Sequence, residues 1–74
     1  METYIDLYLN VDCERASVIH NRLIQLGLKP TIGENDYVYK WEGIVSVEEE
    51  LLFIENIQSA LKGTGAILKF RSKR

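Results

Sequence analysis

The apolar residues of this chain change period several times, and the order of those changes limits the folds that the chain can adopt. In the first segment they occupy every second position: Ile5, Leu7, Leu9 and Val11. This period is typical of a strand with one buried face, so we predict a strand over residues 3–11. The next apolar residues recur every three or four positions: Ala16, Ile19, Leu23 and Leu26. That spacing forms one stripe on a helix, so we predict a helix over 13–26, with Asp12 at its N-terminus and Gly27 after its C-terminus.

A short hairpin follows the first helix. Pro30 cannot donate a backbone hydrogen bond, so the extended segment 28–32 is predicted to be an edge strand. Residues 33–36 are glycine, glutamate, asparagine and aspartate, which favour a turn. The aromatic, alternating segment 37–42 is then predicted to be the returning strand.

The last third of the chain predicts a second helix and a last strand. Ser46 and Glu49 stand three residues apart, which is the spacing of a helix capping box. The apolar residues that follow keep helical spacing for four turns: Val47, Leu51, Ile54, Ile57 and Leu61. Gly63 is predicted to end this helix, residues 66–71 to form a strand, and residues 72–74 to be a disordered basic tail.

The predicted order of elements is βαββαβ over residues 1–71, which form a single domain. Right-handed crossovers place both helices on one face of a four-stranded antiparallel sheet. This arrangement resembles the ferredoxin-like fold, an α+β sandwich, and the resemblance covers nearly the whole chain. It implies the strand order 4-1-3-2, with the first and third strands at the centre. Because this fold hosts many unrelated activities, the function must be argued from individual residues.

Composition narrows the classes of function. The chain has 74 residues and a net charge of −2, so it has no overall attraction to nucleic acid. Its one cysteine cannot form a disulfide within the chain, which suits a reducing cytoplasm. No apolar run approaches the roughly 18–20 residues of a membrane span, so we expect a cytoplasmic protein without a membrane partner.

The third strand decides which residues face the helices. Burying Lys40 and Glu42 would cost several kcal/mol for each unpaired charge. The aromatic residues of that strand are therefore predicted to point inward, with Trp41 largely buried. The opposite, open face then offers a modest apolar set with a polar rim, which is typical of an interaction surface. Its candidate residues are Tyr4, Tyr8, Val38, Lys40, Ile67 and Lys69.

Cys13 lies where the first strand meets the first helix. Heavy-metal-associated domains resemble this chain in size and fold and carry a Cys-x-x-Cys pair at that loop, but here Ala16 stands in place of the second cysteine. A soft-metal site of this kind binds Cu(I) or Zn(II) through two or more thiolates, and His20 lies about 10 Å further along the helix, too far to share an ion with Cys13. We therefore expect no metal and an unreactive thiol, and a thiol-based or metallochaperone-like role is the alternative.

Two other patterns have functional counterparts in known folds. Tyr4 and Tyr8 lie on the open face, as the base-stacking rings of RNA-recognition domains do. The strand over 37–42 lacks the basic, glycine and aromatic opening of that family's motif, so RNA binding is a second alternative and nucleic acid is not the expected partner. The G-x-G pattern at 63–65 follows a helix rather than beginning one, so it predicts a turn and not a phosphate site.

The sequence contains no set of residues that combines a nucleophile, a base and oxyanion donors, so we predict neither enzymatic activity nor a cofactor. The chain resembles ACT-type regulatory domains in the order of its strands and helices, and that resemblance implies a ligand near residues 10–13. We therefore expect a non-catalytic binding or regulatory module with a protein or small-molecule partner. Pro30 blocks the edge of one outer strand, so we also expect a homodimer that forms through the open face or the edge of the last strand.

Overall fold

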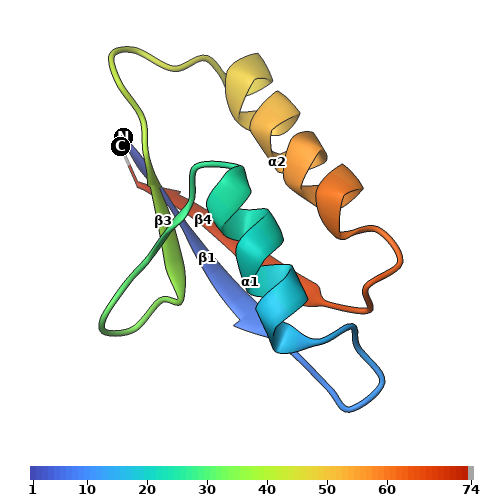
Figure 1. Cartoon of the computed structure of the whole chain (residues 1–74). Coiled ribbons are helices and arrows are strands. Elements are labelled where there is room, and N and C mark those ends of the chain that lie inside the picture. Colours follow the sequence, from blue (N-terminus) through green and yellow to red (C-terminus); the bar gives the residue numbers. More distant parts are fainter. Residues whose placement is uncertain (74) are drawn as a thin grey trace.

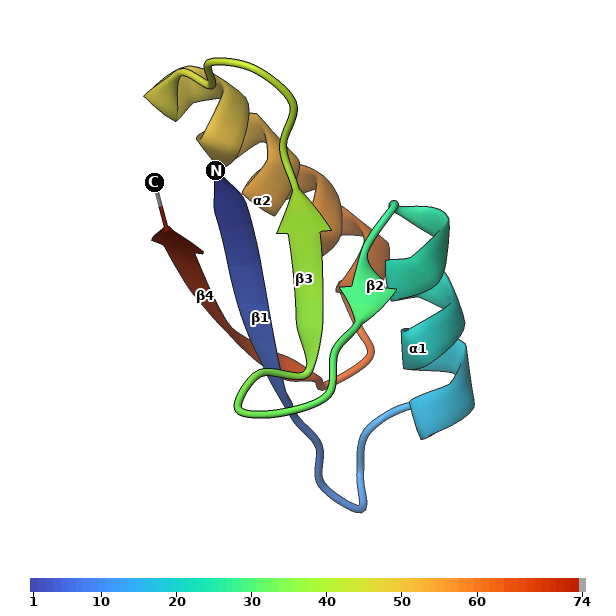
Figure 2. The ribbon, with the colours of Figure 1, turned by 90° about the vertical axis from the view of Figure 1, so that its left-hand side faces the viewer.

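The computed structural model describes residues 1–73 and shows a four-stranded antiparallel sheet with two helices on one of its faces (Figure 1; Figure 2). In chain order the elements are β1 (Glu2–Tyr8), α1 (Ala16–Gln25), β2 (Lys29–Pro30), β3 (Tyr37–Lys40), α2 (Val47–Leu61) and β4 (Ile67–Lys73). The strands lie in the order β2-β3-β1-β4, so the predicted ferredoxin-like arrangement and strand order are confirmed. None of the helices within residues 1–73 is long and apolar enough to cross a membrane.

β1 is shorter than predicted. It ends at Tyr8, where its pairing with β4 also ends. Leu9 and Val11 were expected on the buried face of a longer strand, and both are exposed. The prediction fails there because no strand within residues 1–73 continues beside the chain after Tyr8, so alternation alone does not bury these side chains.

α1 begins later than predicted. The preceding loop is held against the turn before β4, because the Glu14 N–H donates a hydrogen bond to the Thr64 carbonyl (2.7 Å). Asp12 lies in that loop, where its N–H donates to Asn10 Oδ1 (2.8 Å), and the N-cap of the helix is Arg15, so Asp12 does not cap the helix as expected. The first helical residue is Ala16.

The end of α1 agrees with the sequence. The Gly27 N–H bonds the Ile24 carbonyl (3.0 Å) and the Leu28 N–H bonds the Leu23 carbonyl (3.2 Å), which together form a Schellman motif. Gly27 has a φ of +93°, and a Cβ added there would lie 3.2 Å from the Tyr39 ring. The positive φ favours glycine at this position, and the close Tyr39 ring leaves little room for a side chain there.

One cluster of side chains fills the space between the sheet and the helices. Its buried members are Ile5, Ile19, Leu23, Leu28, Tyr37, Ile57 and Leu61. The aromatic residues of β3 and the segment after it point toward this side, as predicted, but Trp41 is only partly buried. The Trp41 indole N–H donates to the buried Thr3 hydroxyl (2.9 Å).

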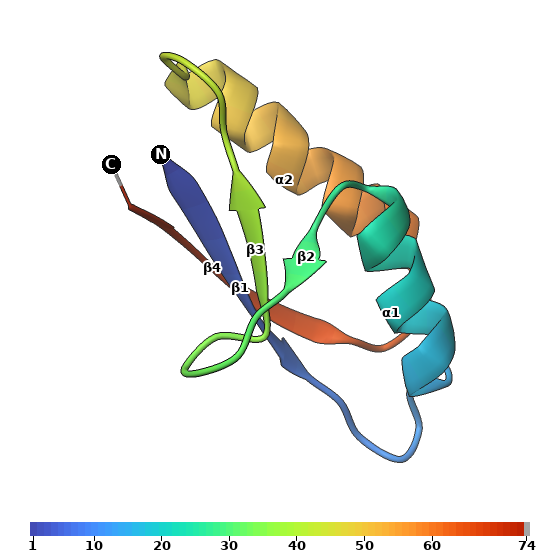
Figure 3. The same cartoon turned by 60° about the vertical axis from the view of Figure 1, so that its left-hand side comes forward.

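α2 packs against β3 and α1 rather than covering the sheet evenly (Figure 3). Its Phe53 ring lies 4.3 Å from the Tyr39 ring and 5.1 Å from the Trp41 ring, measured between centroids. Leu51 was predicted to face the core, and it is 54% exposed. The prediction was wrong because the aromatic contacts of Phe53 set the rotation of the helix, which leaves Leu51 on its uncovered side.

The ends of the remaining elements differ slightly from the predicted ones. Ser46 caps α2 as predicted, since the Glu49 N–H donates to Ser46 Oγ (3.2 Å), while the Glu49 carboxylate accepts from the Ser46 hydroxyl (3.4 Å). β2 contains two residues rather than five, and β3 ends at Lys40. Ser72 and Lys73, expected in a disordered tail, belong to β4, where the Ser72 hydroxyl bonds Thr3 Oγ1 (2.9 Å). Arg74, the rest of that expected tail, lies outside the described residues.

Candidate functional site

The open face of the sheet, predicted to be the interaction surface, has its central tyrosine already engaged. The Tyr4 hydroxyl donates to the Glu2 carboxylate (2.7 Å), and this hydrogen bond raises the pKa of Tyr4. The Arg71 guanidinium lies 5.8 Å from the centroid of the same ring. Tyr4 therefore has partners on both its hydroxyl and its ring.

The loop after β2 folds onto this face, where Figure 2 shows it crossing β1. The Asn35 side-chain amide group donates to Asp6 Oδ1 (2.9 Å), and Arg71 donates to Asn35 Oδ1 (3.3 Å). The Asp36 carboxylate accepts a hydrogen bond from the Leu7 N–H (2.8 Å). A polar network thus occupies the middle of the open face.

The six predicted interface residues do not form one patch. Val38 is 7% exposed, because the sheet places it between the longer side chains of Lys29 and Tyr4. Tyr8 and Ile67 are register partners and are 55% and 62% exposed, at one end of β1. Lys40 pairs with Glu2 at the other end of β1, and Lys69 is exposed on β4. The structure therefore removes Val38 from the predicted surface and separates Lys40 from the apolar pair Tyr8 and Ile67.

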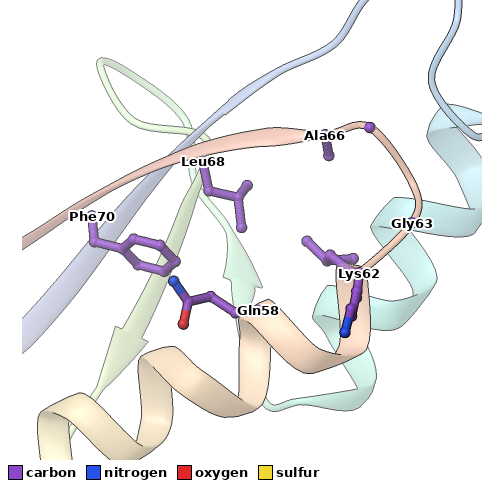
Figure 4. Close-up of a pocket in the computed structure, with 8 residues that line it drawn as sticks. Gln58, Lys62, Gly63, Ala66, Leu68 and Phe70 are labelled. Atoms are coloured by element: carbon purple, nitrogen blue, oxygen red, sulfur yellow. The ribbon is translucent and has the colours of Figure 1, made fainter.

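A different surface, which sequence reasoning missed, lies between β4 and α2. A cavity of about 330 Å³ opens there, and we call it the β4 groove (Figure 4). It is lined by Gln58, Leu61, Lys62, Gly63, Gly65, Ala66, Leu68 and Phe70. In Figure 4 Leu68 and Phe70 point from β4 toward α2, and Gln58 extends from α2 toward Phe70.

The groove continues along α2 as an exposed apolar stripe. Ile54, Leu51 and Val47 precede Gln58 by four, seven and eleven residues, so they lie on the same side of the helix. Leu51 and Val47 are both more than half exposed, and Ile54 is partly buried. The stripe is uncovered because Phe53 anchors the helix on β3 instead of on β4.

The β4 groove lies beside an open strand edge. β4 is the outermost strand on its side of the sheet. The Trp41 N–H donates to the Met1 carbonyl, so odd-numbered residues of β1 direct their backbone groups to β3 and even-numbered ones to β4. Lys69 and Arg71, which pair with Asp6 and Tyr4, therefore bond inward. It follows that Leu68, Phe70 and Ser72 turn their backbone N–H and C=O groups outward.

The two faces of β4 have opposite chemistry. Toward the groove it presents Leu68 and Phe70, and Ala66 lines the groove just before the strand begins. Toward the open face it presents a basic row: Lys69, Arg71 and Lys73, all exposed. A segment that lies along this edge would meet apolar side chains on one face and cations on the other.

Cys13 has a structural position in the loop after β1. Its thiol donates to the Gly65 carbonyl (3.1 Å) and accepts the Asn10 N–H (3.3 Å), so it holds the loop to the turn before β4. The described residues contain no group of three or more His, Cys, Asp or Glu side chains that could hold a metal ion. The G-x-G pattern at 63–65 lies in this turn, and Gly63 has a φ of +83°.

His20 forms a hydrogen bond with Tyr37, a residue of the core cluster. Its Nδ1 lies 2.7 Å from the Tyr37 hydroxyl, and the two rings are 5.8 Å apart between centroids. Burial raises the pKa of Tyr37, and the nearby Asp36 carboxylate raises it further. His20 thus provides a hydrogen-bond partner for the hydroxyl of the buried Tyr37 at the rim of the core.

Comparison with protein-family models, with curated proteins and with solved structures returned no match. The sequence signal that could have revealed the β4 groove is Phe53, whose aromatic side chain lies off the predicted stripe and faces the inward rings of β3.

Proposed function

We propose that the chain is a non-catalytic, cytoplasmic binding module that accepts an extended segment of a partner protein along the outer edge of β4. The added segment becomes a fifth strand, and every second side chain enters the β4 groove. The observation that carries this proposal is the coincidence of an open strand edge with an open groove on the same residues, Leu68 and Phe70, whose apolar side chains line it.

The edge and the groove supply different parts of the binding free energy. Outward N–H and C=O groups on Leu68, Phe70 and Ser72 can bond the backbone of any extended segment, which gives affinity without sequence preference. The groove selects side chains, because burying its apolar surface gains about 25 cal/mol for each Å² removed from water. Charged side chains beside an open strand edge limit non-specific aggregation, and Lys69 and Lys73 lie beside this edge.

The opposite edge of the sheet is less suited to a partner. β2 contains only two residues, Lys29 and Pro30. The Thr31 N–H bonds the Asp36 carbonyl inward (3.0 Å), so the neighbouring Pro30 faces outward at the position where it lacks an N–H. This geometry favours β4 as the edge that receives a partner.

Self-association through β4, which the sequence also suggested, is disfavoured by charge. Antiparallel pairing of two β4 strands would bring the rows of Lys69, Arg71 and Lys73 from both copies together on one face. Like charges directly opposite one another destabilise a strand pair. We therefore propose a partner other than a second copy, and expect a monomer when sedimentation is measured at about 100 μM.

Selection from a displayed library of random dodecapeptides tests the proposal without assuming a ligand. We expect the enriched peptides to contain apolar residues at every second position. When such a peptide binds ¹⁵N-labelled protein, amide exchange should slow at Leu68, Phe70 and Ser72, whose N–H groups then gain partners.

Two leucines of α2 provide a matched pair of variants. Leu51 and Leu52 are 54% and 58% exposed, but only Leu51 lies on the stripe that borders the groove. Leu51→Lys should weaken peptide binding about tenfold, equal to the loss of roughly 1.4 kcal/mol of apolar contact, and Leu52→Lys should leave it unchanged. Equal effects of the two variants, or binding that leaves the amides of β4 unaltered, would exclude β4 as the site.

A further inference from the structure

The proposed function leaves the chemistry of the bound segment open, and the two faces of β4 define it. Resting on that proposal, we infer that the partner segment alternates apolar and acidic residues, with its carboxylates on the open-face side. The basic row formed by Lys69, Arg71 and Lys73 selects the acidic positions, and the β4 groove selects the apolar ones.

The pairing of β4 with β1 already combines acidic residues on the open face with apolar residues on the core face. Lys69 lies opposite Asp6 and Lys73 lies opposite Glu2 in the register with β1. β1 thus places carboxylates beside the basic row on the open face, and Ile5 in the core on the other face. A fifth strand on the outer side meets the same row, so the same alternation of charge and apolar character is favoured there.

The geometry of a sheet makes this selection short-range. Side chains directly opposite one another on neighbouring strands have Cβ atoms about 4.5–5.5 Å apart. Each pair of opposite charges at that separation changes affinity by about 1.5- to 5-fold. Acidic residues opposite Lys69, Arg71 and Lys73 should together favour an acidic segment over a basic one by at least about tenfold.

On the helix side a carboxylate is less favourable. The side chains that β4 itself contributes to the groove, Leu68 and Phe70, are apolar, and the one cation among the lining residues, Lys62, lies at the far end directly after α2. A carboxylate buried beside Leu68 and Phe70 would therefore lack a cationic partner on β4. The first turn of α2 also carries Glu48 and Glu49, which repel an acid near the end of the apolar stripe. The two faces therefore specify alternation and not merely negative charge.

Three seven-residue peptides test this inference, each the length of β4. The alternating acidic peptide is Val-Glu-Val-Glu-Val-Glu-Val, the basic control replaces Glu by Lys, and the block control has the same composition as Val-Val-Val-Val-Glu-Glu-Glu. In titrations of ¹⁵N-labelled protein we expect the acidic peptide to shift the amides of residues 67–73 and to bind at least about tenfold more tightly than either control. An analogue of the acidic peptide with N-methylated amides at alternate positions should lose this binding, because it cannot donate to the edge.

A second experiment reverses the charge of two residues of the basic row on the protein. Lys69→Glu with Lys73→Glu should invert the preference, so that the basic peptide binds more tightly. The matched control is Lys29→Glu with Lys40→Glu, which makes the same change in net charge on β2 and β3 and should leave the preference unaltered. Arg71 is kept because it bonds Asn35 and stacks on Tyr4.

The outcomes separate the inference from the proposed function. If acidic and basic peptides bind β4 equally, or the block control equals the alternating peptide, the inference is wrong while strand addition stands. If the peptides shift no amide of β4 and the library yields no binder there, the proposed function itself is wrong. If single-stranded RNA moves the amides of Tyr8 and Lys69 more than the acidic peptide does, the basic row serves a nucleic acid and the inference is also wrong.

Discussion

Replacing Ile57 by alanine should destabilise this small domain strongly, and the size of the loss follows from its surroundings. Ile57 is fully buried among the residues of the core cluster, where its side chain leaves α2 toward the sheet. Removing three carbons loses about 2.4 kcal/mol of transfer free energy, at about 0.8 kcal/mol for each carbon. Incomplete closure of the space left behind adds up to about 2 kcal/mol. We therefore expect the free energy of unfolding to fall by about 2–5 kcal/mol.

The same substitution at Leu51 should cost much less. About half of its side chain is already in water, since Leu51 is 54% exposed, and solvent fills the space left by truncation. The expected loss is about 1 kcal/mol, and the higher helix propensity of alanine reduces it slightly. The two positions lie six residues apart on one helix, so the comparison holds the secondary structure constant.

Urea denaturation followed by circular dichroism measures both losses. A domain of this size has a total stability of about 4–11 kcal/mol, so Ile57→Ala could fail to fold. Ile57→Val then replaces it, with an expected loss of about 0.5–1.5 kcal/mol. A loss at Leu51 as large as that at Ile57 would refute the position of α2, because it would mean that Leu51 is buried.

Three other predictions concern groups with specific partners. Trp41→Phe removes the indole donor to Thr3 and should cost about 1–3 kcal/mol in urea denaturation, while the native indole should be only partly quenched by iodide. Thr64→Ala should cost about 1–2 kcal/mol, because the Ala66 N–H loses its acceptor, and Thr64→Ser should recover at least half of that loss. The pKa values of Tyr4 and Tyr37 are raised above 10.0, so the fold prefers their protonated forms. Stability should then decline as the pH rises through those raised values, and a free energy of unfolding that stays constant from about pH 9 to about pH 11 would contradict this.

The fold could be predicted because each element carries its own local signal. Alternation of Ile5 and Leu7, the glycine after α1 and the capping box at Ser46 depend on neighbours within a few residues. Even so, the alternation of apolar residues continues to Leu9 and Val11, although the strand ends at Tyr8. The length of a strand depends on its partner, and that partner lies far away in the sequence.

The candidate site could not be predicted in the same way. Helical spacing places Leu51, Ile54 and Ile57 on one stripe, but it does not say which part of a wide stripe meets the sheet. That choice was made by Phe53 packing on Tyr39 and Trp41, a contact between elements. Val38 illustrates the same limit, since its burial comes from its neighbours Lys29 and Tyr4 across two strand pairs.

The pairing of Glu2 with Lys73 brings the two ends of the described chain together, as Figure 1 shows at the N and C labels. The central strand β1 therefore pairs with a strand about seventy residues away, which closes a long loop for a sheet of this size. Folding must bring that loop together before the sheet is complete, and a high proportion of distant contacts slows folding. A short peptide that links the ends would turn β4 and β1 into a local hairpin. With new termini at the exposed turn over 33–34, such a circular permutant should fold faster and reach the same sheet by a different order of events.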